Sequence, residues 1–129
     1  MTNEPIPLSI RLQDYLVCVL LHLMFPLLPL GLEYWITQNV AETSLTLMAS
    51  VYAISIGLSS SSPLLFAISL TISFIFSFAF GIISAQKSLP LATELAITSI
   101  MAIFLIHAIE RYKLHIIKGK RFWVWFNEE

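Results

Sequence analysis

The chain alternates long apolar runs with short polar breaks. Four runs, at 15–36, 44–58, 63–86 and 90–112, are dominated by hydrophobic and small residues. A helix needs about 20 such residues to cross a hydrocarbon core of about 30 Å, and three of the runs reach that length comfortably. The pattern predicts an all-α integral membrane protein with four transmembrane helices and short hairpin loops. Residues 1–14 form an N-terminal segment and residues 113–129 a tail.

The polar breaks contain signals that start helices. In "SSSSP", at 59–63, Ser62 occupies an N-cap position and Pro63 the first helical position. In "KSLP", at 87–90, Ser88 or Leu89 precedes Pro90 in the same manner. One long helix through Pro63 is the alternative, but four serines beside a proline disfavour it.

Two prolines interrupt the first apolar run near its middle. Pro26 and Pro29 each remove a backbone N–H and crowd the preceding turn, so a kink or a break is expected there. Such a break either bends the helix around its neighbours or creates a site for an ion or a substrate.

Composition supports a membrane protein and excludes several classes of function. Of the 129 residues, 57% are hydrophobic and 12% charged, whereas soluble domains average about 25% charged. The net charge of −1 gives no basis for direct binding of nucleic acid. Cys18 is the single cysteine, so neither an intrachain disulfide nor a CxxC site can form. With no nucleotide loop, metal-ligand set or nucleophile motif, we expect neither an enzyme nor a cofactor.

The distribution of basic residues predicts the orientation. Six of the seven lysines and arginines lie before the first run, at the end of the fourth run or after it, and only Lys87 lies in a loop on the other side. By the positive-inside rule both termini are cytoplasmic, in a multi-pass protein of the bacterial inner membrane.

Small residues recur at every fourth position in two neighbouring runs. Because lipid supplies no hydrophobic drive, membrane helices associate through close contacts that small side chains permit. We therefore expect these faces to pack helices within the subunit and between subunits, in a homo-oligomer for which a tetramer is the working assumption. An alternative is a pore lined by the serines, with Phe74 or Phe78 as a hydrophobic gate. The two stripes are Ala49, Ala53, Gly57 and Ser61, and Ser69, Ser73, Ser77, Gly81 and Ala85.

Two histidines lie at similar depth in the first and fourth runs. His22 and His107 are candidates for a proton-sensitive intramembrane pair, and the alternative is that each neutral ring bonds a neighbouring helix. The acidic residues all lie near the ends of the runs, which disfavours a proton-coupled antiporter.

The tail combines basic and aromatic residues. It is expected to continue the fourth helix as far as Lys118, with Gly119 ending it. Tryptophans beside lysines are typical of interfacial anchors, and tryptophan and arginine are also typical of protein interfaces. The tail therefore binds either lipid or a cytosolic protein. Its candidate residues are Lys118, Lys120, Arg121, Phe122, Trp123, Trp125 and Phe126.

The four apolar segments followed by the tail, including Arg121–Phe126, resemble the KwaA family, the membrane subunit of the Kiwa anti-phage defence system. The resemblance implies a small four-span protein that assembles in the membrane, works with a cytosolic DNA-binding partner and senses envelope disturbance. It assigns no functional residue. We therefore expect a non-enzymatic subunit that forms homo-oligomers and anchors, or signals to, a cytosolic effector. The alternatives are a phage holin or toxin-like pore, and a small ion or solute channel.

Overall fold

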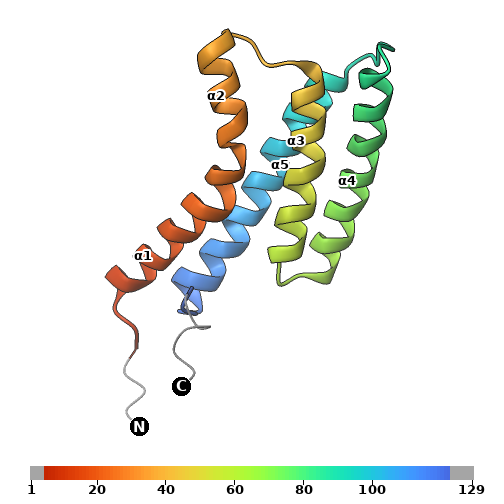
Figure 1. Ribbon diagram of the computed structural model, residues 1–129. Coiled ribbons are helices and arrows are strands. Elements are labelled where there is room, and N and C mark those ends of the chain that lie inside the picture. Colours follow the sequence, from red (N-terminus) through yellow and green to blue (C-terminus); the bar gives the residue numbers. More distant parts are fainter. Residues whose placement is uncertain (1–4, 123–129) are drawn as a thin grey trace, which may run out of the picture.

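The computed structural model describes residues 5–122, which form helices and no strand (Figure 1). Successive helical rods run in opposite directions, so the two ends of the described chain lie at the same end of the molecule (Figure 1). The elements are α1 (Leu8–Cys18), a π-helical turn η1 (Val19–Met24), a 3-10 turn η2 (Phe25–Leu27), α2 (Leu28–Thr37), α3 (Glu42–Ser59), α4 (Pro63–Ser84), α5 (Ala92–Tyr112) and a π-helical turn η3 (Lys113–Ile117).

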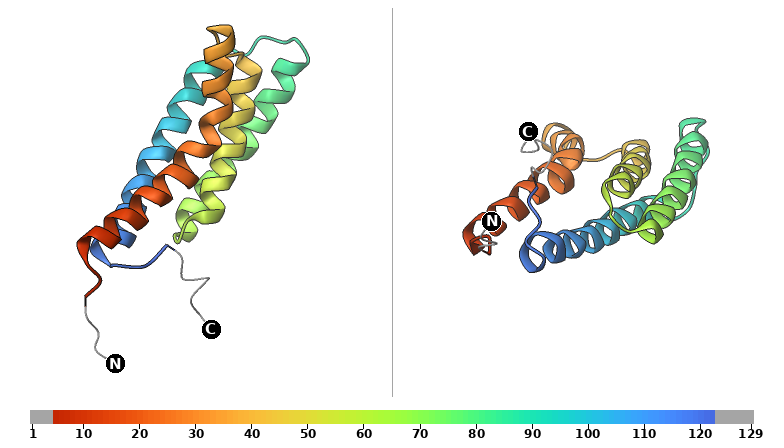
Figure 2. Two further views of the ribbon diagram at one scale, coloured as in Figure 1. Left: turned by 60° about the vertical axis from the view of Figure 1, so that its left-hand side comes forward. Right: turned by 90° about the horizontal axis from the view of Figure 1, so that it is seen from below.

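Three helical segments are long and apolar enough to cross a membrane: Leu8–Thr37, Pro63–Ser84 and Ala92–Ile117. The expectation of spans in the first, third and fourth runs is therefore supported by the helices that form there. The shorter helix α3, of 18 residues, contains several serines and threonines and lies between α4 and α5, with α2 and η2 also in contact with it (Figure 2).

Three helix starts differ from the expected positions. α3 begins at Glu42 instead of residue 44, because the carbonyl of Ala41 already accepts a hydrogen bond from the N–H of Leu45. α1 begins at Leu8 instead of residue 15, because the carbonyl of Pro7 accepts hydrogen bonds from Ile10 and Arg11 and nothing breaks the turn that follows. α5 begins at Ala92 rather than Pro90, since Leu91 adopts a left-handed conformation with φ of 63°. α4 ends at Ser84, two residues before the end expected for the third run.

The other break has the expected form. α3 ends at Ser59 and α4 begins at Pro63, so the two helices are separate. The hydroxyl of Ser62 accepts a hydrogen bond from the N–H of Leu65 at 3.4 Å, which satisfies one of the free donors at the start of α4.

The helical segment Leu8–Thr37, which comprises α1, η1, η2 and α2 and is called the first rod below, is kinked at the prolines. Between α1 and α2 the chain passes through η1 and η2, and the direction of the rod changes there (Figure 2). Pro26 has no N–H to offer the preceding turn, so the regular helical bonding cannot continue through it. The hydroxyl of the fully buried Tyr52, on α3, donates to the carbonyl of Leu23 at 3.3 Å and links the kink to the neighbouring helix.

The core lies around α3, which packs against α4 on one side and α5 on the other. The buried residues of this core come from η1, α3, α4 and α5. They are Leu23, Leu45, Ala49, Tyr52, Ala53, Ile56, Phe76, Ala79, Ala96, Ile100 and Ile103.

Candidate functional site

The two small-residue stripes meet in the contact between α3 and α4. Ala49, Ala53 and Gly57 are buried on α3, and Ser69 and Ser73 are buried on α4. The later members of the α4 stripe, Ser77, Gly81 and Ala85, belong to exposed positions. Each step of four overshoots a helical turn by about 40°, so one stripe cannot stay in a single straight contact. Ser61, expected as the last member of the α3 stripe, lies beyond the end of α3 at Ser59 and is exposed, so it does not take part in this helix contact.

Serine hydroxyls join the same two helices. Ser50 donates to the carbonyl of Ser73 at 2.9 Å, and its oxygen lies 3.2 Å from the hydroxyl of Ser73 and 2.8 Å from that of Ser77. The sequence analysis does not single out Ser50, although it lies next to Ala49 of the α3 stripe. Phe74 and Phe78 face outward, at 60% and 74% exposed. Within one chain, therefore, the serines pack helices and these phenylalanines lie on the outer surface.

A polar cluster connects α5 to the turn between α3 and α4. One carboxylate oxygen of Glu110 accepts three hydrogen bonds from that turn: from the hydroxyl of Ser60 at 2.9 Å, and from the N–H and hydroxyl of Ser61 at 3.0 and 2.8 Å. Its other oxygen lies 2.9 Å from Nδ1 of His107. Glu110 thus fixes the turn between α3 and α4 and also orients the ring of His107. This role could not be predicted from the sequence, in which Glu110 is an acid near the end of an apolar run, about 50 positions from Ser60 and Ser61.

His107 is completely buried, and the bonds around it define its tautomer. The Nε–H of Arg111 donates to Nε2 of His107 at 3.1 Å, and Arg111 also donates to the carbonyl of Ser59. Since arginine is only a donor, Nε2 must accept, which leaves the proton on Nδ1, where it bonds Glu110. A second proton, on Nε2, would place two N–H groups face to face.

His22 lies near this cluster without a direct bond to His107. The ring of His22 stands edge-on to the ring of Phe122, with centroids 5.3 Å apart. The ring of His115 also contacts Phe122, with centroids 6.1 Å apart. Nδ1 of His22 is buried and has no hydrogen-bond partner within residues 5–122. The bonded partners of His107 are Glu110, Arg111 and Ser59, and His22 is not among them.

The start of the tail is clamped onto the first helix. Nε of Arg121 donates to Oδ2 of Asp14 at 2.9 Å, and the N–H of Phe122 reaches the same oxygen at 3.4 Å. Asp14 is buried, while the Arg121 side chain remains 44% exposed. A second bond runs from Nη1 of Arg11 to the carbonyl of Ile116 at 3.2 Å. We call these contacts the tail clamp.

Gly119 allows the chain to enter the clamp. It has φ of +63°, which glycine adopts at no steric cost, and a Cβ there would lie 3.2 Å from the Arg11 guanidinium. The helical part of the tail ends just before it, as the sequence indicates: α5 continues through η3 to Ile117. Lys118 and Lys120 are exposed. The other expected tail residues, Trp123, Trp125 and Phe126, lie outside the described residues.

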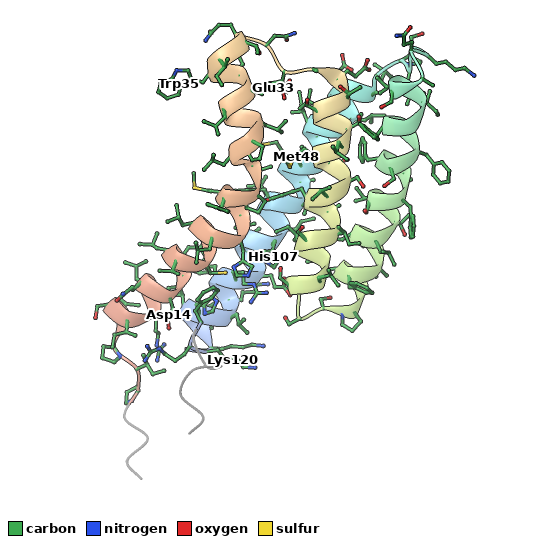
Figure 3. The ribbon with its side chains drawn as sticks, in the orientation of Figure 1. Asp14, Glu33, Trp35, Met48, His107 and Lys120 are labelled. Carbon is green, nitrogen blue, oxygen red and sulfur yellow. The ribbon has the colours of Figure 1, made fainter. Side chains whose placement is uncertain are left out.

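The polar cluster and the tail clamp share one end of the molecule. Figure 3 places Asp14, His107 and Lys120 toward that end, and Glu33 and Trp35 toward the other. Within residues 5–122, no group of three or more histidine, cysteine or acidic side chains is arranged to hold a metal ion. The cluster can position a turn, relay a proton or respond to helix movement, since its groups are bonded to one another across three elements.

No protein-family model matches the chain, and neither a curated protein nor a solved structure is significantly similar to it.

Proposed function

We propose that the chain is a non-enzymatic membrane subunit that passes a change in the packing of its helices to a soluble effector through its tail. In this proposal four helices cross the bacterial inner membrane, and α3 packs against the other three helical segments. Both termini are cytoplasmic, and several copies assemble into one body.

Aromatic residues support this placement in a bilayer. Tyr15 and Tyr112 pack edge-to-face at the clamp end, with centroids 5.6 Å apart, and Tyr34 and Trp35 are exposed at the other end of the first rod. Tyrosine and tryptophan prefer the two membrane interfaces. The 19 helical steps from Tyr15 to Tyr34 rise by about 30 Å, which is the thickness of a hydrocarbon core.

The charges support the orientation. The clamp end carries Arg11 and the basic residues of the tail, whereas Lys87 lies in the loop before α5, at the opposite end (Figure 1). The positive-inside rule then assigns the clamp end to the cytoplasm. The exposed half of the α4 stripe, Ser77, Gly81 and Ala85, is the surface we propose for contact with another copy.

The tail clamp is the single observation that carries the proposal. The first residues of the tail are bonded to a helix that enters the membrane, through Asp14 with Arg121 and through Arg11 with the Ile116 carbonyl. A shift of α1 relative to α5 changes the distance between these partners and so changes how the tail is presented. By its resemblance to the Kiwa membrane subunit, we propose disturbance of the envelope during phage attack as the stimulus.

The proposal is tested with a truncation after Arg121. The truncated chain is expected to insert and to form the same oligomer as the full chain, but to lose a soluble protein that co-purifies with the full chain. Lys87→Ala, at the other end of the helices, is the control and should keep that protein. Retention of the same protein by the truncated chain contradicts docking through the tail.

Expression without other genes separates this function from that of a holin. A holin or toxin-like pore collapses the membrane potential by itself, whereas a signalling subunit leaves the potential of growing cells unchanged. A potential-sensitive dye measures the difference. Collapse by the full chain alone contradicts the proposal and favours the pore.

A further inference from the structure

The kinked first rod and α5 enclose an open groove of about 540 Å³. Its wall is formed by Leu20, Leu21, Met24, Phe25, Leu27 and Leu28 of the first rod and by Phe104 of α5. The groove begins in η1 and ends in α2, so it follows the kink that the prolines impose. Both walls belong to segments long and apolar enough to cross a membrane.

The chemistry of the wall excludes a polar ligand. Every lining side chain is a leucine, a methionine or a phenylalanine, and nearly all of the lining surface is apolar. An occupant finds no hydrogen-bond donor, acceptor or charge there, so only a hydrocarbon group matches the wall.

A helix from a second copy is poorly matched to this wall. Membrane helices associate through small residues, which let their backbones approach closely. The wall contains none, in contrast to the contact between Gly57 and Ser69 on α3 and α4.

We propose that the groove binds an acyl chain of a membrane phospholipid. The flexible chain follows the bend between α1 and α2 and contacts Phe104 on the opposite wall. It fills the space that the kink opens beside α5, which the side chains of residues 5–122 leave empty. The bound lipid then holds the first rod at a fixed position relative to α5.

Native mass spectrometry of the full chain, extracted in a mild detergent, tests the proposal by counting retained phospholipid. The unchanged chain is expected to retain phospholipid, and Met24→Trp, which fills the groove, is expected to lose it. Leu21→Trp is a second filling variant with the same expected loss. Ile75→Trp is the matched control, because Ile75 is an exposed apolar residue at the middle of α4, away from the groove, and should leave retention unchanged.

Three results would overturn the proposal. The first is that the unchanged chain retains no phospholipid. The second is that Ile75→Trp loses phospholipid as fully as the filling variants do. The third is cross-linking between copies in native membranes through Phe25→Cys, in a Cys18→Ser background, which would show that a second copy occupies the groove instead.

Discussion

Gly57 on α3 lies so close to Ser69 on α4 that a Cβ added to the glycine would come within 2.8 Å of the serine Cβ. Ser69 is itself fully buried at this point. The two backbones therefore approach as closely as their smallest side chains allow, which is how helices gain contact energy when the solvent is lipid.

Gly57→Ala is expected to lower the free energy of unfolding by about 1–3 kcal/mol, because the added methyl forces α3 and α4 apart. Gly31→Ala is the control on α2, since nothing lies within 4 Å of its Cβ position, and it should leave stability unchanged or slightly raised. Thermal unfolding in detergent measures both variants. Equal stability of the two would contradict the close contact.

A compensating change sharpens this test. Adding Ser69→Gly to Gly57→Ala removes the atom that the new methyl meets, so part of the lost stability should return. If the double variant is as unstable as the sum of the single variants, the damage arises elsewhere.

Glu110→Ala is expected to free the turn between α3 and α4. The variant removes the acceptor of three hydrogen bonds, including the one from the Ser61 N–H, so amide exchange at Ser61 should accelerate. Glu94→Ala serves as the control, because Glu94 is exposed on the same helix. Hydrogen exchange followed by peptide mass analysis reports both. An unchanged Ser61 exchange rate argues against the observed bonding.

Asp14→Ala is expected to release the start of the tail. The bond to Arg121 is partly exposed, so it contributes only about 0.5 kcal/mol, and trypsin cleavage at Arg121 should accelerate about twofold. Glu33→Ala removes an acid at the other end, where it accepts from the Ala41 N–H, and should leave that cleavage rate unchanged. Identical rates for both variants would rule out the clamp.

Tyr52→Phe is expected to lower the free energy of unfolding by about 1 kcal/mol, because it removes the hydroxyl that donates to the Leu23 carbonyl at the kink. Tyr34→Phe removes the hydroxyl of an exposed tyrosine and should have no measurable effect. Chemical unfolding of the two variants in detergent measures the difference. No loss in Tyr52→Phe would mean that the kink does not depend on α3.

Local features of the molecule could be derived from the sequence alone. The lengths of the apolar runs predict the long helices, "SSSSP" predicts the start of α4 at Pro63, and the prolines of the first run predict its kink. Gly119 likewise follows the helical part of the tail, with positive φ. Each of these depends on neighbouring residues only, through a missing N–H, a cap or a run of apolar side chains.

Only the tertiary structure decided which partners meet. Asp14 and Arg121 are 107 positions apart, and Ser61 and Glu110 are 49 apart, so their pairing depends on how each helix is rotated and placed against the others. A change of one residue in a helix turns a side chain by about 100°, and no local pattern determines that angle between distant rods. The groove beside Phe104 has the same origin, because it exists only where the kinked rod and α5 lie beside each other.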